Sequence, residues 1–267
     1  MTKERLDILL VERKLIDTRE KAKRLIMAGQ VYSENIRLDK PGTKYETDIP
    51  LNVKGSLPYV SRGGLKLEKA LDAFDISVSN KTIVDIGAST GGFSDCALQN
   101  GATLIYAIDV GYNQLDWKIR SDERVVVMEK TNFRYVTEED FIKGLPEFAM
   151  IDVSFISLSL ILPVLKKILK PRSDVVTLIK PQFEARKDEV GKKGIIRDSK
   201  VHEKVLMRVV EFILKNEFNI HEITFSPITG SAGNIEFLAH LSTGKDVTKT
   251  EINIKDIVLD AHNNLTK

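Results

Sequence analysis

A glycine-rich turn that directly follows a short apolar strand limits the fold of this chain more than any other feature. In "KTIVDIGASTGGFS", Ile83 and Val84 have the pattern of a buried strand, and Asp85 stands at its carboxyl end. The glycines that follow let the backbone pass closely beneath a ligand before a helix begins at Phe93 or Ser94. This order predicts an α/β protein with a ligand site at the turn.

Strand-like and helical patterns continue to alternate after the turn, which favours a parallel sheet with helices on both faces. Further strands are expected in "ATLIYAIDVG", "RVVVMEKTN", "FAMIDVSFISL" and "DVVTLIKPQFE", and a final hairpin in "HEITFSPITG" and "GNIEFLAHLS". The predicted fold is therefore α/β and Rossmann-like, with a seven-stranded, mostly parallel sheet that ends in a C-terminal antiparallel hairpin.

The first 55 residues form a different module, which is basic. They hold twelve Lys and Arg against nine Asp and Glu, whereas the whole chain has a net charge of only +2. "RLDILLVERKLI" has helical spacing of its apolar residues, and Asp17 is expected to cap a second helix, with Glu20 three residues later and Gly29 at its end. That helix places Arg19 and Lys23 one turn apart, where a phosphate backbone could lie, although a solvated helix face has the same composition.

This module resembles the S4 RNA-binding domain in its opening "RLD", the helix "TREKAKRLI" and the following "AGQVYSENIRL". The resemblance implies a small α+β domain over residues 1–55, whose second helix and following loop lie against structured RNA. The side chains that it indicates are Arg5, Arg19, Lys23 and Arg24. Residues 56–62 are expected to be a short linker, and residues 63–267 the larger domain.

The turn has the form D-x-G-x-x-x-G-G, which differs from the G-x-G-x-x-G of dinucleotide-binding proteins. Asp85 would repel a phosphate but can hold an ammonium group, which favours S-adenosylmethionine over NAD. Asp109 ends the next strand about 20 residues on, where a carboxylate can accept both hydroxyls of a ribose. That spacing is shared by both cofactor classes, so a dinucleotide and a turn without ligand remain alternatives. The predicted cofactor-binding residues are Asp85, Gly87, Ser89, Gly91, Gly92, Phe93, Asp109 and Asn132.

Two lysines and two carboxylates come from four elements whose ends we expect to meet at one edge of the sheet. Lys66 lies in "YVSRGGLKLEKAL", Asp152 and Lys180 end two strands, and Glu236 lies in the second hairpin strand. Such a set suits deprotonation of an alcohol, because a lysine can act as a base when burial or a neighbouring ammonium lowers its pKa. Each residue alone is explained by an ordinary salt bridge, and Lys69, one turn on, competes with Lys66.

Six motifs over nearly the whole chain are similar to those of the TlyA family: "YVSRGGLKL", "DIGASTGGFSDCAL", "AIDVGYNQLDWKIR", "MIDVSFISL", "LIKPQFEA" and "GNIEFLAHL". The resemblance implies an FtsJ-like, S-adenosylmethionine-dependent methyltransferase domain that 2'-O-methylates cytidine riboses in large-subunit ribosomal RNA, or in both subunits. It also implies a catalytic tetrad at the matching positions, which are Lys66, Asp152, Lys180 and Glu236. The implied partners are ribosomal RNA or ribosomal subunits.

Other classes of protein fit the sequence less well. The family also carries the name hemolysin A, but no apolar run has membrane-spanning length and the amino terminus is charged, so a cytoplasmic protein is expected. One cysteine and four scattered histidines predict neither disulfides nor a metal site. A dehydrogenase would leave the paired lysines without a task, and a non-catalytic ribosome assembly factor would need no tetrad. Residues 184–199 are interpreted as a loop that could close over RNA, or as a plain surface connection.

Overall fold

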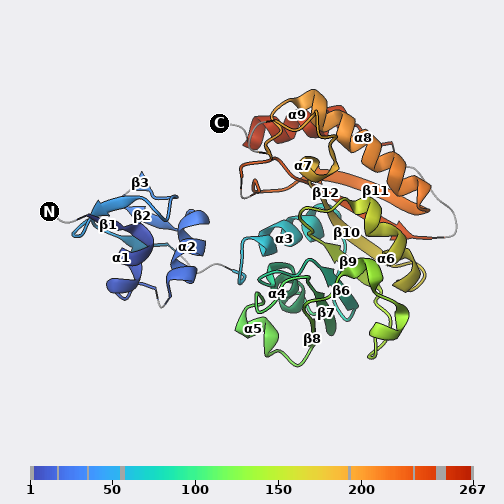
Figure 1. The fold of residues 1–267 in the computed structure, drawn as a ribbon, viewed down its shortest axis with the longest axis horizontal. Helices are drawn as coiled ribbons and strands as arrows, with labels where there is room; N and C mark the ends of the chain where they lie inside the picture. The colour runs from blue at the N-terminus through green and yellow to red at the C-terminus, as the bar shows by residue number, and fades with distance from the viewer. Residues whose placement is uncertain are drawn as a thin grey trace. The chain divides into compact units, whose positions relative to one another are not determined.

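In a computed structural model of the protein, the chain folds into two compact units, Met1–Arg62 and Gly63–Lys267 (Figure 1). The structure describes residues 3–16, 18–34, 36–54, 58–191, 194–230, 232–244 and 251–265. The first part of the predicted linker, residues 56–57, lies outside the described residues, as does the predicted helix cap Asp17.

The amino-terminal unit packs two helices against two small antiparallel sheets. One sheet pairs β1 with β4, and the other has the order β3-β2-β5. Apolar residues of both helices, including Leu6, Leu10, Leu25 and Ile26, form its buried core. The elements are β1 (Lys3–Arg5), α1 (Leu6–Glu12), α2 (Arg19–Met27), β2 (Val31–Ser33), β3 (Ile36–Arg37), β4 (Lys44–Glu46) and β5 (Asn52–Val53).

The ends of α2 follow local sequence signals. Thr18 is the N-cap residue, and its side chain accepts a hydrogen bond from the backbone N–H of Lys21. Gly29, just beyond the last helical turn, has a φ of +71°, which glycine adopts without strain. Strand β1 was not predicted, because its three residues gain a partner only in β4, where Arg5 lies opposite Lys44.

The larger unit is built on the predicted seven-stranded sheet, in the order β11-β12-β10-β9-β6-β7-β8. Strand β12 is antiparallel to both of its neighbours, and the pairs from β10 to β8 are parallel. The predicted C-terminal hairpin is therefore confirmed, with its second strand inserted beside β10. The elements are α3 (Gly63–Ala73), β6 (Thr82–Ile86), α4 (Gly92–Gln99), β7 (Leu104–Ile108), α5 (Trp117–Arg120), β8 (Val125–Met128), η1 (Phe133–Tyr135), η2 (Glu138–Asp140), β9 (Phe148–Ile151), η3 (Leu158–Leu160), α6 (Leu162–Ile168), β10 (Asp174–Ile179), α7 (Pro181–Glu184), α8 (Ser199–Lys215), β11 (Phe218–Phe225), β12 (Phe237–Thr243) and α9 (Ile254–Leu265).

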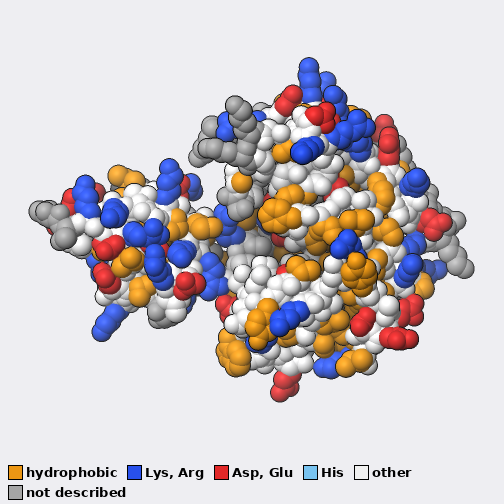
Figure 2. Space-filling view, viewed as in Figure 1, with side chains coloured by type: hydrophobic (Ala, Val, Ile, Leu, Met, Phe, Trp, Pro, Cys, Tyr) orange, Lys and Arg blue, Asp and Glu red, His pale blue; other side chains and the backbone are white. Residues whose placement is uncertain are grey.

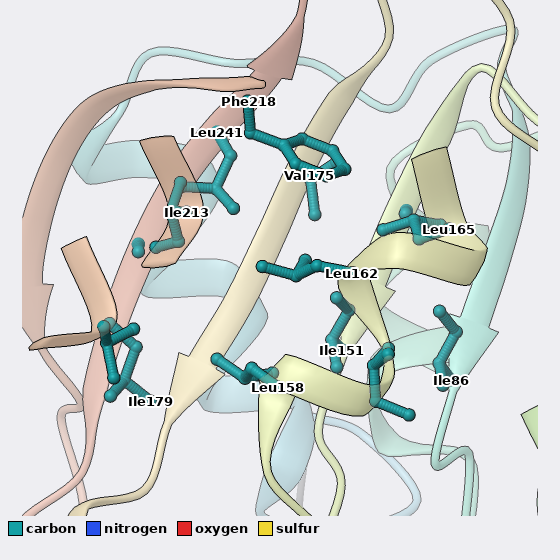
Figure 3. Close-up of a cluster of buried hydrophobic side chains, with 14 of the residues drawn as sticks. Ile86, Ile151, Leu158, Leu162, Leu165, Val175, Ile179, Ile213, Phe218 and Leu241 are labelled. Atoms are coloured by element: carbon teal, nitrogen blue, oxygen red, sulfur yellow. The ribbon is translucent and has the colours of Figure 1, made fainter. Parts of the chain in front are cut away.

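Helices cover both faces of this sheet because alternate strand residues point to opposite sides. On one face, Ile86 and Ile151 lie near Leu162 and Leu165 of α6, and Ile213 of α8 belongs to the same buried cluster (Figure 3). On the other face, α4 lies against β6 and packs beside α3. The carboxyl ends of β6, β7, β8, β9 and β10 are left at one edge, where ligands of open α/β sheets bind. No helix among the described residues is long and apolar enough to cross a membrane.

Candidate active site

A cavity of about 430 Å³ opens at the carboxyl ends of β6, β7, β8 and β9. Four of the predicted cofactor residues line it: Gly87, Ser89, Asp109 and Asn132. Thr131 and Phe133, which follow β8, lie beside Asn132, and residues 152–156, which follow β9, form the opposite wall. The cavity lies where the sequence predicted a ligand, at the turn after the first strand of the parallel sheet.

The glycine turn is shaped by close contact with the loop after β9. Gly87 has a φ of +85°, and a Cβ atom there would lie 2.5 Å from the backbone oxygen of Asp152. Only glycine fits this position, because any side chain would push the two loops apart. The other predicted residues of the turn lie at the start of α4 and are not part of the described lining of the cavity: Gly91, Gly92 and Phe93.

Asp109 lines the cavity and is held there by two backbone hydrogen bonds. Its two carboxylate oxygens accept hydrogen bonds from the backbone N–H groups of Ser89 at 2.8 Å and Gly111 at 2.7 Å. A carboxylate has about four acceptor positions, so both oxygens can still accept the hydroxyls of a ribose. The group therefore fits the predicted cofactor.

Asp85 lies beneath the turn and not on the cavity surface. It is fully buried, and its Oδ2 accepts a hydrogen bond of 2.6 Å from the hydroxyl of Ser94 in α4. Burial raises the pKa of Asp85 to about 7. Its Oδ1 has no hydrogen-bond partner among the described residues. The glycine turn thus lies between the Asp85 carboxyl group and the cavity. Its predicted contact with the ammonium group of a ligand stays a prediction.

We expect Asp109→Ala to lose roughly 1 to 3 kcal/mol of S-adenosylmethionine affinity, because hydrogen bonds to a charged group contribute on that scale. Calorimetric titration of the folded variant measures the change. Asp116→Ala is a matched control, since Asp116 caps α5, the helix that follows β7 in the chain, and does not line the cavity. Equal affinity of Asp109→Ala and the parental protein would remove Asp109 from the ligand site.

The four residues of the predicted tetrad are brought into contact beside this cavity. The Nζ atom of Lys66, from α3, lies 2.7 Å from Oε2 of Glu236 and 3.4 Å from Oδ2 of Asp152. Lys180, directly after β10, forms an ion pair with Oδ1 of Asp152 and donates a hydrogen bond of 3.1 Å to the Ser154 hydroxyl. Asp152 therefore joins the two lysines and also lines the cavity.

This network is largely removed from water. The exposed fraction is 8% for Lys66 and for Lys180, and 3% for Glu236. Burial disfavours the Lys66 ammonium, but the carboxylates of Asp152 and Glu236 outweigh it and raise the pKa of Lys66. Burial likewise disfavours the Asp152 carboxylate, yet the two lysines lower its pKa. Lys66 is thus an ammonium and Asp152 a carboxylate at neutral pH.

Lys69, the competitor of Lys66, has different surroundings. Its Nζ lies 3.6 Å from the centre of the Phe225 ring, and burial lowers its pKa.

Glu236 stands one residue before β12, not within it as predicted. Gly230 makes room for this carboxylate, because a Cβ at Gly230 would overlap its Oε1.

Sequence reasoning missed several residues of the cavity. Gln114 and Arg134 follow β7 and β8, and Ser154 and Phe155 follow β9. The signal for the last pair was their position after Asp152 at the end of a parallel strand. Phe155 is 91% exposed and has a φ of +63°, which is rare for a bulky residue.

The arginines predicted to bind RNA also have structural contacts within the amino-terminal unit. Arg5 and Arg19 both form ion pairs with Asp7, at 2.9 and 2.8 Å, and Asp7 is fully buried. Burial disfavours the charged form of Asp7, but the two arginines lower its pKa. Arg24 donates a hydrogen bond of 2.6 Å to the backbone oxygen of Val60. Lys23 has the longest of these contacts, because its Nζ atom lies 4.0 Å from Oε1 of Glu20.

Comparison with known proteins identifies both units. A model of the FtsJ-like methyltransferase family matches residues 59–243. The chain belongs to the FtsJ-like methyltransferase family. A model of the S4 domain matches residues 4–48, so this FtsJ-like methyltransferase carries an S4 domain before its catalytic fold, as its sequence predicted.

Two relatives and one solved structure align with this FtsJ-like methyltransferase over nearly its whole length. It is 62% identical over 270 residues to the Bacillus subtilis protein named "Putative rRNA methyltransferase YqxC", with 98% of this chain and 95% of the relative covered. It is 38% identical over 256 residues to the Mycobacterium tuberculosis protein named "16S/23S rRNA (cytidine-2'-O)-methyltransferase TlyA", with 95% of each covered. A solved structure described as "Putative hemolysin from Streptococcus thermophilus" is 54% identical, has a TM-score of 0.79, and covers 99% of this chain and 97% of that one. The predicted relationship to the TlyA family is confirmed.

Proposed function

We propose that this protein transfers a methyl group from S-adenosylmethionine to the 2'-hydroxyl of a cytidine ribose in ribosomal RNA, in the large subunit alone or in both subunits. The observation that carries the proposal is the network of Lys66, Asp152, Lys180 and Glu236 at the wall of the cavity. The names of the TlyA relatives support the nucleotide and the RNA. Such a substrate would place the activity in the cytoplasm, where ribosomal RNA is found.

The cofactor would be held by groups that the structure places around the cavity. Asp109 would accept the ribose hydroxyls, and Asn132 would reach the adenine. Gly87 would let the methionine end pass close to the backbone, above the buried carboxyl of Asp85. When bound, S-adenosylmethionine supplies the methyl group on a positively charged sulfur.

Within the tetrad, Lys180 is the proposed base. Lys66 is held as an ammonium by two carboxylates, whereas Lys180 contacts one carboxylate and the neutral hydroxyl of Ser154. To act as the base, the Lys180 ammonium of the ion pair must first release its proton to solvent. The neutral amine would then take the proton of the ribose 2'-hydroxyl as the hydroxyl oxygen attacks the methyl carbon in line and the bond from that carbon to sulfur breaks. Asp152 would orient both lysines, and Glu236 would balance the charge of Lys66.

The first experiment maps 2'-O-methyl sites on ribosomal RNA from cells with and without this protein. Disappearance of one or more cytidine modifications, and their return with the parental gene but not with Lys180→Ala, would support the proposal. Separate incubations of the purified protein with free RNA, large subunits and small subunits would identify the substrate. Unchanged modification maps, together with no methyl transfer to any of the three substrates, would refute it.

We further propose that residues 1–55 bind RNA through Arg5, Arg19, Lys23 and Arg24, that residues 56–62 are a linker, and that residues 63–267 are the methyltransferase domain. The match to the S4 domain supports this division, as do the Lys and Arg side chains spread over the visible face of the amino-terminal unit (Figure 2). Arg5 and Arg19 can pair with Asp7 and still contact RNA, because their side chains are 37% and 45% exposed.

Replacing Arg19 and Lys23 together with alanine should weaken RNA binding for all sequences and make its salt dependence shallower, while S-adenosylmethionine affinity is unchanged. Filter binding over a series of salt concentrations measures both quantities. Because Arg19 also pairs with buried Asp7, Lys23→Ala alone is the cleaner variant, and it should reduce the salt slope by about 1 if Lys23 meets one phosphate. Retention of affinity and slope by both variants would assign these residues to an ordinary solvated surface.

A further inference from the structure

A carboxylate from α7 holds the loop that follows β9. Oε1 of Glu184 accepts a hydrogen bond of 2.8 Å from the backbone N–H of Leu158, and Oε2 accepts one of 2.7 Å from the Ser157 hydroxyl. Ser157 is the N-cap residue of η3, so Glu184 spans the start of that short helix. Glu184 is half-buried, and burial raises the pKa of its carboxyl group.

The loop after β9 and the segment that contains α7 are also joined beside the predicted tetrad. Four residues before Glu184, Lys180 donates its hydrogen bond to Ser154 and pairs with Asp152. The rings of Phe155 and Phe183, one from each segment, have centroids 5.0 Å apart. Residues 152–158 and 180–184 therefore share polar contacts at both ends and an aromatic contact between them.

The loop needs this support because its backbone is strained. Phe155 has a left-handed φ of +63°, a conformation that costs a residue with a side chain roughly 1 kcal/mol or more. Such a conformation persists where surrounding contacts impose it. The contacts of Glu184 lie two and three residues beyond Phe155 and are the only side-chain hydrogen bonds that the described part of α7 makes to this loop.

We propose that Glu184 is a positioning residue, which fixes the loop after β9 so that Asp152 and Ser154 stand in register with Lys180. This inference rests on the proposed methyl transfer for its kinetic consequence. The cofactor cavity gives it a second consequence, because residues 152–156 form one wall. Loosening the loop should therefore weaken cofactor binding as well as misplace the catalytic side chains.

The test compares Glu184→Ala and Glu184→Gln with Glu147→Ala in the full-length protein. Glu147 is a matched control because it stands just before β9, accepts a hydrogen bond of 3.2 Å from the backbone N–H of Thr82, and pairs with Lys170 at 3.6 Å. Three quantities are measured: amide hydrogen exchange, the Kd of S-adenosylhomocysteine by calorimetry, and the single-turnover rate with ribosomal RNA and S-adenosylmethionine saturating.

For Glu184→Ala we expect faster exchange confined to residues 152–160 and a Kd about 3- to 10-fold higher, the range for one or two hydrogen bonds. The single-turnover rate should fall about 10- to 100-fold, because a displacement of about 1 Å at a reacting group can have that effect. Glu184→Gln should lie between this variant and the parental protein, since an amide oxygen can replace one of the two acceptors. Glu147→Ala should stay within about twofold of the parental protein in Kd and rate.

Unchanged exchange, Kd and rate in folded Glu184→Ala, or in Glu184→Gln if the alanine variant does not fold, would overturn the proposal and leave Glu184 with a role in stability alone. Failure of the proposed function is distinguishable from this result. If the parental protein transfers no methyl group, the exchange and Kd measurements still decide whether Glu184 positions the loop.

Discussion

Lys180→Ala is expected to lower the single-turnover rate of methyl transfer by about 10²-fold or more, which is the usual contribution of a positioned acid or base. The affinities for S-adenosylmethionine and RNA should stay nearly intact, because Lys180 does not line the cofactor cavity and the hydrogen bonds of Glu184 still hold the loop after β9. The measurement uses ribosomal RNA with both ligands saturating, so that it reports the chemical step.

Lys180→Arg separates a base from a fixed positive charge. A guanidinium stays protonated and cannot accept the hydroxyl proton, so the arginine variant should fail almost as completely as the alanine variant. Transfer at near the parental rate by Lys180→Arg would show that the residue acts electrostatically or by position. Lys69→Arg is a suitable control, because Lys69 lies over Phe225 on the same helix as Lys66 but outside the ion-pair network.

Asp152→Asn should have the second large effect, because Asp152 is the one residue of the tetrad that contacts both lysines. Without this charge Lys66 keeps only Glu236 as a charged partner and Lys180 loses its carboxylate partner, so neither lysine keeps its orientation. We expect the methyl-transfer rate to fall about 10²-fold or more. The free energy of unfolding should fall by roughly 1 to 3 kcal/mol at pH 7, because the buried Lys66 ammonium loses one of its two carboxylate partners.

The stability effect of Asp152→Asn should depend on pH. The folded protein lowers the pKa of Asp152 below its usual 3.8, so the carboxylate contributes stability that is present above that pH and is lost as the pH falls through the folded-state value. The difference in unfolding free energy between parental protein and variant should therefore be full at pH 7 and should shrink below about pH 4. Urea unfolding at pH 7, 5 and 3 measures it, with Asp72→Asn, at an exposed position on α3, as the control. An equal difference at all three values would mean that the charge of Asp152 does not stabilise the fold.

Hydrophobic patterning predicted most of the fold because it reports burial locally. Apolar runs such as "TIVDI" and "DVVTLI" became β6 and β10, and the late hairpin became β11 and β12. The short β1 was not predictable in this way, since its partner strand lies far along the chain. The position of the N-cap was also shifted: Thr18 accepts the capping hydrogen bond of α2, and both Thr18 and the expected Asp17 suit that role.

The candidate site was predictable to the level of which residues stand at strand ends. A parallel sheet places all carboxyl ends at one edge, so Asp109, Asp152 and Lys180 could be assigned to one region from the sequence. How deeply each side chain is buried could not be predicted, because burial depends on how loops and helices pack. Asp85 stands at a strand end as well, yet α4 covers it and Ser94 bonds to it.

The sequence by itself determined the alternation of strands and helices, the place of the glycine-rich turn after the first parallel strand, and the residue types available for chemistry. Those properties depend on neighbours along the chain. The tertiary structure alone decided which charges meet. It paired Lys66 rather than Lys69 with two carboxylates and brought Arg19 of α2 to Asp7 of α1. It also bound the loop after β9 to Glu184. Contacts of this kind join residues far apart in the chain, and the energy of a buried charge depends on partners that no local pattern specifies.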